Sequence, residues 1–191
     1  MNNTLFKIYQ HPALKHDKLE AMFNMHTRVT ILKGEFLLKQ GQTASEYYCL
    51  ESGLIRSYAI SSEGKDITTG FFGQNEIVIE VASLFLRTPT SENIQALTDC
   101  ICWQINLIDF QKLADTIPGF MEWGRAWMAG VLFATKQRSL SMITDPAIKR
   151  YQLLIEQHPN IIRHAKLRYI ASYLGITDTS LSRIRKEMTH A

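Results

Sequence analysis

The chain has 191 residues, of which 46% are hydrophobic and 20% are charged, and its formal net charge is +3 at pH 7. This composition is typical of a folded protein of one large or two small domains, and it excludes a wholly disordered chain. The longest uncharged apolar run, at 126–134, is much shorter than the about 20 residues of a membrane helix, and the N-terminus has no signal-peptide apolar block. We therefore expect a cytoplasmic protein without membrane contact.

The basic residues are concentrated towards the C-terminus. Residues 1–144 hold 13 Lys and Arg against 14 Asp and Glu, whereas residues 145–191 hold 8 against 4. A basic surplus confined to one segment is typical of a nucleic-acid-binding surface. Alone it is a weak signal, because basic surfaces are common.

The N-terminal half changes from a helical to a strand-like pattern. Residues 5–26 carry apolar side chains near helical spacing and are predicted to be helical. Short strand-like runs separated by glycine-containing turns follow, at intervals of roughly 8–12 residues, which is typical of an antiparallel sandwich or barrel. The sequence therefore predicts a β-roll, or jelly-roll-like unit, at about 28–106. Its expected strands are 29–32, 35–39, 46–50, 54–60, 67–72, 76–86, 92–98 and 101–105.

Three cysteines, Cys49, Cys100 and Cys102, do not make a disulfide framework. Cys100 and Cys102 are two residues apart in a strand-like run, so they share one face, as a metal or redox pair would. No His/Cys cluster completes the usual four zinc ligands, so we expect buried thiols in a reduced compartment and no metal. A cupin-type enzyme is also disfavoured, because residues 28–106 contain no histidine.

The longest helical pattern of the chain covers 120–142. Phe120, Trp123, Trp127 and Val131 recur at three- and four-residue spacing, and a second apolar stripe runs beside them. A helix that is apolar on two faces needs two partners. One is the β-roll, and we expect the other to be the same helix of a second subunit, with these four side chains at the dimer interface. Burial inside a monomer is the alternative.

Two shorter helices flank this long one. The first is predicted at 107–117, before a proline and a glycine. The second is predicted to begin at Asp145 and Pro146, with the aspartate as N-cap and the proline at the first helical position, and to stop at Pro159.

Residues 165–189 have the pattern of a helix-turn-helix. An apolar first helix ends at Gly175, where the sharp turn between two helices needs an unhindered residue, and Ala171 is small where the helices approach. Thr177 can cap the second helix with its hydroxyl. Leu181 and Ile184 are directed inward at helical spacing.

The outer face of this second helix is polar and cationic, which favours DNA binding over a plain helical hairpin. Thr179, Ser182 and Arg183 are predicted to read base edges, with Arg183 suited to a guanine. Asp178 would repel phosphate, so we expect it to accept from a cytosine amino group or to orient an arginine. Phosphate contacts are predicted for Lys166, Arg168, Thr177, Arg185 and Lys186.

The order of β-roll, long helix and C-terminal helix-turn-helix resembles the Crp/Fnr family of bacterial transcription regulators over nearly the whole chain. The most specific match is LGITDTSLSRIRKEM, which is similar to the family's recognition helix, and the runs KGEFLLKQGQ, ESGLIRSY and FFGQNE carry the β-roll match. The resemblance implies an α+β fold in three parts. These are an effector β-roll at 1–119, a dimerisation helix at 120–144 and a DNA-binding domain at 145–191.

The resemblance also implies a homodimer that reads a palindromic operator in double-stranded DNA, with RNA polymerase and a small-molecule effector as further partners. Family members carry a β-wing after the recognition helix, but the sequence stops almost directly after that helix, so wing contacts are not expected. A sensor that acts through its β-roll on a protein partner is the alternative. Deletion after Met142 would abolish DNA binding but spare such a sensor.

Cyclic-nucleotide binders of the family use a Gly-Glu pair for the ribose and an Arg-Ser/Thr pair for the cyclic phosphate. Glu80 matches the glutamate, but Ile79 replaces the glycine, and Thr90, followed by Ser91, stands at the arginine position. The phosphate would lose a charge-assisted bidentate contact. The resemblance implies an effector pocket at Glu80, Thr90 and Ser91, and the residues present disfavour cyclic AMP.

Other cofactors have little support in the sequence. No cysteine precedes Cys49, which disfavours the N-terminal iron–sulfur cluster of the family's oxygen sensors. His11, His16 and His26 leave haem open, although scattered surface histidines are the simpler interpretation. We expect no cofactor, and the effector stays unidentified.

Overall fold

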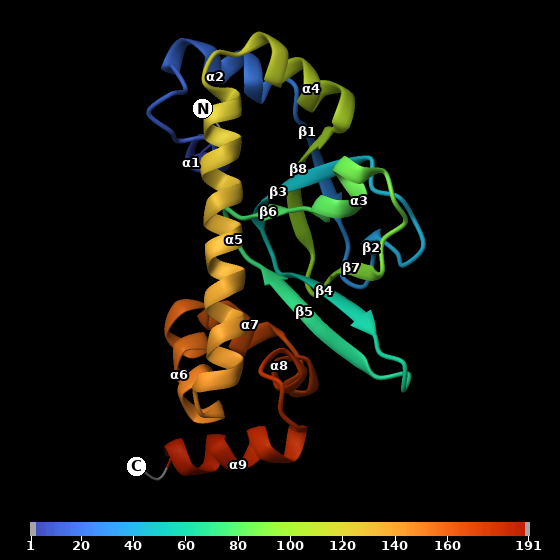
Figure 1. Cartoon of the computed structure of the whole chain (residues 1–191), viewed down its shortest axis with the longest axis vertical. Coiled ribbons are helices and arrows are strands. Elements are labelled where there is room, and N and C mark those ends of the chain that lie inside the picture. The colour runs from blue at the N-terminus through green and yellow to red at the C-terminus, as the bar shows by residue number, and fades with distance from the viewer. Residues whose placement is uncertain (1–2, 190–191) are drawn as a thin grey trace.

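The computed structural model describes residues 3–189, so residues 1–2 and 190–191, which the expected domain limits include, lie outside it. Within the described range, two four-stranded antiparallel sheets form a β-roll, with strand orders β1-β8-β3-β6 and β2-β7-β4-β5 (Figure 1). The predicted α+β architecture is confirmed. The strands are β1 (Thr27–Ile31), β2 (Phe36–Leu38), β3 (Glu46–Ser52), β4 (Ile55–Ile60), β5 (Asp66–Phe72), β6 (Ile77–Val78), β7 (Glu92–Ala96) and β8 (Cys100–Asn106).

Helices lie at both ends of the β-roll and beside it (Figure 1). The long helix α5 runs along one side of the molecule and connects the N-terminal helices to the C-terminal helical unit. The helices are α1 (Asn3–Ile8), α2 (His16–Phe23), α3 (Val81–Leu86), α4 (Leu107–Thr116), α5 (Phe120–Thr144), α6 (Ala147–Gln157), α7 (Pro159–His164), α8 (Leu167–Tyr173) and α9 (Asp178–Thr189).

The predicted strand at 76–86 is wrong beyond its first residues. Only β6 is extended, and α3 follows directly, because the Glu80 carboxylate accepts from the Ser83 N–H at 2.6 Å and caps a helix. An uninterrupted apolar run fits a buried strand and a buried helix equally well, so periodicity could not separate them.

Smaller differences occur at helix ends. The predicted helix at 5–26 is two helices, α1 and α2, with a turn containing Pro12 between them. Helix α6 begins at Ala147, so Asp145 closes α5 rather than capping α6, and Pro146 is the N-cap. Pro159 stops α6 as predicted but also opens α7, which the sequence pattern did not indicate.

The turn between β3 and β4 requires glycine. Gly53 has φ +108°, and a Cβ built on it would lie 2.8 Å from the carbonyl oxygen of Asp99. A side chain is therefore excluded both by backbone conformation and by the close approach of the β7–β8 connection.

The three thiols are free and buried, as predicted: Cys49, Cys100 and Cys102 are all at most 1% exposed. Burial raises the pKa of each thiol, so none is a thiolate at neutral pH. Among residues 3–189 no cluster of three metal-ligating side chains was found. Within the same residues, every helix is too short or too polar to cross a membrane.

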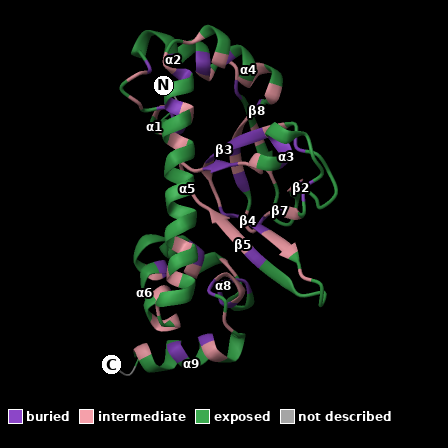
Figure 2. Cartoon of the chain, in the orientation of Figure 1, coloured by how far each residue is buried: buried purple, intermediate pink, exposed green. Residues whose placement is uncertain are grey.

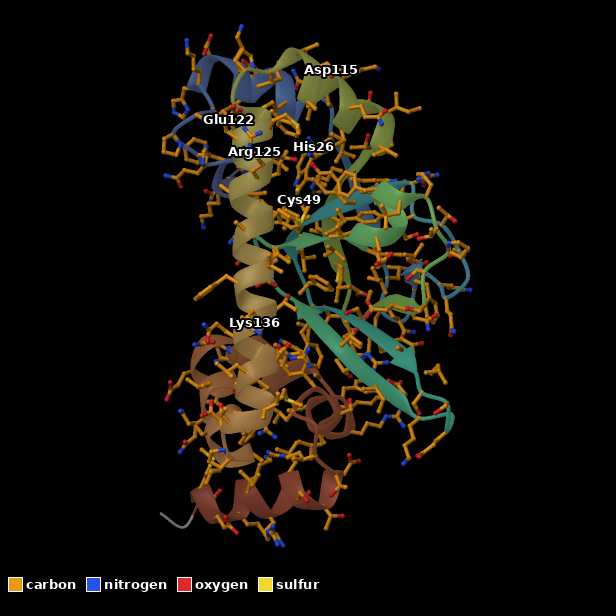
Figure 3. The ribbon with its side chains drawn as sticks, viewed as in Figure 1. His26, Cys49, Asp115, Glu122, Arg125 and Lys136 are labelled. Carbon is orange, nitrogen blue, oxygen red and sulfur yellow. The ribbon has the colours of Figure 1, made fainter. Side chains whose placement is uncertain are left out.

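A buried hydrogen-bonded chain joins the N-terminal segment to β3. The Nδ1 atom of His26 lies 2.9 Å from the Met22 carbonyl oxygen, and its Nε2 atom lies 2.8 Å from Tyr9 Oη, which is 2.7 Å from Tyr47 Oη. A carbonyl only accepts, so Nδ1 carries the proton, Tyr9 donates to Nε2, and Tyr47 donates to Tyr9. Figure 3 labels His26, in the region where the N-terminal helices meet the roll.

Acid is expected to weaken this junction. Burial lowers the pKa of His26 from 6.5 to about 4, so the unfolded chain binds a proton before the folded chain does. The contribution of neutral His26 to the free energy of unfolding is complete above about pH 6.5. It falls by up to roughly 3 kcal/mol as the pH is lowered to about 4. Urea unfolding of the wild type and of His26→Gln, compared at about pH 7 and pH 4.5, should show less pH dependence in the variant. Equal pH dependence in both proteins would contradict this assignment.

Helix α5 is buried at its start and exposed along most of its remaining length (Figure 2). Phe120 and Trp123 are 1% and 5% exposed, and they pack on Tyr9, with ring centroids 6.2 and 4.6 Å away. These two residues are therefore core residues of the chain and not dimer contacts, which corrects the sequence prediction. Trp127 is partly buried against the same core, and only Val131, at 39%, is exposed.

Candidate nucleic-acid interface

Helices α8 and α9 are joined by the predicted sharp turn. Gly175 has φ +67°, and the Ile176 N–H donates across the turn to the Ala171 carbonyl at 3.0 Å. A Cβ on Gly175 would meet the terminal methyl of Met142 of α5 at 2.3 Å. The glycine thus supplies both the left-handed conformation and the space that α5 fills.

The second helix begins and packs as the sequence predicts. Thr177 Oγ1 accepts from the Ser180 N–H at 3.2 Å, which is the expected N-cap bond. Leu181 and Ile184 are 0% and 7% exposed and share a hydrophobic core with Ala171, which is fully buried. This packing fixes which side of α9 remains outside.

The exposed side of α9 gathers most of the predicted base-reading residues. At about 100° per residue, the buried side is centred between Leu181 and Ile184. Thr179, Ser182 and Lys186 are exposed on the opposite side, and Arg183 lies next to them. Helix α9 lies at the end of the molecule farthest from α2 and α4, so this face is unobstructed by the β-roll (Figure 1).

Two predicted residues on α9 have different surroundings. Arg183 Nε lies 3.8 Å from Glu187 Oε1, in an exposed pair one turn apart. Such a pair contributes at most about 0.5 kcal/mol, so DNA can replace the carboxylate. Arg185 lies nearer to the buried side of α9 than Ser182 and Lys186, and all three border a groove that Tyr151 and Ile155 of α6 also line. Arg185 is better placed for the DNA backbone than for base edges.

The cations of the first helix gather around Tyr169. Lys166 Nζ and the Arg168 guanidinium lie 5.9 and 5.0 Å from its ring centroid. The pKa of Arg168 is raised chiefly by its hydrogen bond to Tyr169 Oη and also by the nearby carboxylates of Asp66 and Asp178.

A buried arginine that the sequence reading overlooked connects this unit to the β-roll. Arg56 of β4 is 1% exposed and makes two hydrogen bonds with Asp66, of 2.8 and 2.9 Å. Its guanidinium also stacks on Tyr58 of its own strand, at 4.0 Å, and on Tyr169 of α8, at 3.6 Å. The Asp66 side chain is 37% exposed, so the buried stacking on the two tyrosine rings is the better shielded part of this contact. An arginine inside a largely apolar strand was the signal available in the sequence.

Further polar contacts dock α8 against β5. Ser172 Oγ accepts from the Thr68 N–H at 3.1 Å. Arg138 of α5 donates to the carbonyls of Thr69 and Tyr173, both at 3.1 Å, and so joins α5, β5 and α8. Within the described residues the helix-turn-helix is therefore held by β-roll and α5 together, and these contacts orient α9.

The predicted effector residues do not act together. Glu80 borders a cavity of about 460 Å³ beside Tyr48 and Ile94, inside the roll. Thr90 is 5% exposed, its hydroxyl accepts from the Glu92 N–H at 3.0 Å, and it is outside that cavity lining. Ser91 is exposed. The structure thus brings only Glu80 to the cavity, and its carboxylate already caps α3.

Comparison with known proteins agrees with this arrangement. The family described as the cyclic nucleotide-binding domain matches residues 28–116. The fumarate and nitrate reduction regulatory protein of Yersinia pestis is 26% identical over 184 residues, which cover 90% of this chain and 73% of that protein. The anaerobic regulatory protein of Bacillus subtilis is 32% identical over 76 residues, 40% of this chain and 32% of that protein.

Solved structures share the fold. FixK2 from Bradyrhizobium japonicum superposes with a TM-score of 0.74 at 19% identity, covering 86% of this chain and 85% of that one. The catabolite activator protein of Thermus thermophilus gives 0.60 at 19% identity, covering 98% and 87%. Residues 28–116 therefore match the cyclic nucleotide-binding domain, and the chain is similar in sequence or in fold to these regulators over most of its length.

Proposed function

We propose that the chain is a sequence-specific DNA-binding regulator of transcription, in which α9 enters the major groove. The single observation that carries the proposal is the exposed polar face of α9, where Thr179, Ser182, Arg183 and Lys186 lie together opposite the buried stripe. The N-terminal residues of such a helix reach base edges, and the cations neutralise phosphates. This role implies a cytoplasmic protein that works with RNA polymerase and not an enzyme.

We further propose a homodimer that forms along α5. Phe133, Leu140 and Ile143 are 66%, 48% and 84% exposed, and with Ala126 and Ala129 they follow the alternating three- and four-residue spacing of a coiled-coil seam. Lys136 takes the remaining position of this seam and is marked in Figure 3. A dimer about this helix would set two α9 helices on half-sites of a palindromic operator, about 34 Å apart.

The DNA proposal predicts different effects for two cations of α9. Arg183→Ala should weaken binding to a selected operator by about 10- to 100-fold and relax the preference at one base pair, because a bidentate base contact is worth about 1–3 kcal/mol. Lys186→Ala should weaken binding to all sequences alike. The slope of log affinity against log salt concentration should become less steep by about one. Electrophoretic shifts with operators selected from random DNA would measure both.

Lys112→Ala on α4, at the opposite end of the molecule from α9, is the matched control and should leave the affinity unchanged. Absence of any sequence preference at moderate salt in the wild type would overturn the proposal.

The alternative, a sensor acting through its β-roll on a protein partner, is better tested with these point variants than by deletion after Met142. Leu54 and Phe71 of the roll share a core with Tyr151 and Ile170, so the deletion would expose them to water. A sensor of this kind would retain its activity in Arg183→Ala.

We also propose that cyclic AMP is not the effector. The cavity beside Glu80 lacks an arginine among its lining residues, and the Glu80 carboxylate is engaged by the Ser83 N–H. A calorimetric titration with cyclic AMP should show no binding at micromolar concentration. Saturable micromolar binding would contradict this expectation.

A further inference from the structure

A second cavity lies on the other face of β3. Adjacent side chains of a strand point to opposite sides, and Tyr48 borders the cavity inside the roll whereas Tyr47 borders a cavity of about 290 Å³ beside α5. The lining of this second cavity comes from β3, the β6 region, α3, α4 and α5. It is therefore separate from the family's nucleotide pocket, although Ile79 touches both.

The walls of this cavity are aromatic and held in place. The Phe110 ring packs edge-on against Tyr47, Phe85 and Phe120, with centroids 5.8, 5.6 and 5.3 Å away. Tyr47 is fixed by its 2.7 Å bond to Tyr9, and the Trp123 indole N–H donates to the Ile8 carbonyl at 2.9 Å. Side chains held in this way lose little conformational entropy when a ligand binds, so they form a preformed apolar site.

The walls of the cavity are almost wholly apolar, and one charged residue borders it. The hydroxyl of Tyr47 and the indole N–H of Trp123 are already bonded, and burial raises the pKa of Tyr47, so both side chains are neutral. Arg125 is the one charged residue among the lining residues, and its guanidinium lies 3.2 Å from Glu122 in a largely exposed pair (Figure 3). Such a pair is weak, so an incoming anion can replace Glu122.

The partner helix proposed above would not fill this cavity. At about 100° per residue, Met121, Gly124, Arg125 and Met128 are centred about 120° around α5 from Phe133 and Leu140, and Arg125 is the one of the four that lies nearest to the seam. The cavity therefore opens beside the dimer and not into it.

From this geometry we propose that the cavity binds a small apolar monocarboxylate, an aromatic or short acyl acid. The ring or chain lies among the aromatic walls, and the carboxylate pairs with Arg125. A cavity of this size suits a ligand at the lower end of the usual range for small-molecule sites. The proposal does not depend on DNA binding, and it gives α5 contact with a ligand on one side and with a second subunit on another.

The test compares two matched probes, 4-phenylbutyrate and the neutral 4-phenyl-1-butanol, by calorimetry and by the emission of Trp123 and Trp127, which line the cavity. The full-length wild type should bind both, and the acid about tenfold more tightly because of the charge-assisted bond. Arg125→Gln should remove that preference while retaining the alcohol.

Gly124→Leu should abolish binding of both probes. A Cβ on Gly124 meets nothing within 4 Å, so a leucine there projects into the cavity without disturbing the fold. Gly130→Leu on the same helix, where a Cβ also meets nothing, is the matched control and should bind both probes like the wild type.

Three results would overturn the proposal: no saturable binding of either probe, binding unaffected by Gly124→Leu, or binding that occurs only in a monomeric variant such as Phe133→Glu. The last would assign the cavity to a second subunit. Because the probes are read without DNA, a failure here is distinct from a failure of the DNA-binding proposal.

Discussion

Phe133→Glu is expected to separate the two subunits of the dimer proposed along α5. Phe133 is 66% exposed on the seam that also carries Leu140 and Ile143, and a carboxylate there would be buried against its symmetry mate. We expect dimerisation to weaken by at least about 100-fold, which corresponds to roughly 3 kcal/mol. Sedimentation velocity would measure the oligomeric state, and operator affinity should fall with it because each monomer holds one half-site.

Val131→Glu is the matched control, since Val131 is also exposed but points away from the seam. It should remain dimeric. A monomeric Val131→Glu together with a dimeric Phe133→Glu would mean that the stripe through Trp127 and Val131, which the sequence indicated, forms the interface after all.

Arg56→Met is expected to loosen the helix-turn-helix from the β-roll. The substitution keeps the apolar length of the side chain but removes two hydrogen bonds to Asp66 and stacking on Tyr58 and Tyr169. We expect a loss of about 1–2 kcal/mol in the free energy of unfolding, because the buried guanidinium loses its hydrogen bonds and its stacking, while the Asp66 carboxylate, which is 37% exposed, regains water. Hydrogen exchange should accelerate in α8, which packs on β5.

Arg56→Lys should lower the free energy of unfolding by almost as much, because an ammonium group can neither form a bidentate pair nor stack as a planar group. Arg28→Met removes a mostly exposed pair with Glu51, 3.4 Å long, and should change stability by no more than about 0.5 kcal/mol. Unchanged exchange in α8 of Arg56→Met would show that apolar packing alone holds the two units together.

Most of the recognition unit was predictable from sequence because its determinants are local. The positive φ of Gly175, the cap at Thr177 and the inward spacing of Leu181 and Ile184 each depend on residues within a few positions. The same holds for the outward set on α9, because burial of one stripe fixes the opposite one.

The sequence alone could not determine which face of the long helix α5 packs on the core. Periodicity found an apolar helix at 120–142 but could not decide which stripe meets the chain's own core. Tyr9, which is more than a hundred residues away in the sequence, packs on Phe120 and Trp123, and both side chains are buried. Periodicity cannot distinguish two apolar stripes on one helix. Only the packing of other segments against the helix decides which face stays exposed for a partner.

The sequence by itself determined the α+β order of β-roll, long helix and helix-turn-helix, and which residues of α9 face outward. Tertiary structure alone decided three things: that 81–86 is a helix, that Phe120 is buried whereas Phe133 stays exposed on α5, and that Arg56 contacts α8 from the roll. The physical reason is distance along the chain. Caps, turns and amphipathic stripes are set by neighbours a few residues apart, whereas the burial of Arg56 and of Phe120 depends on segments that meet only after folding.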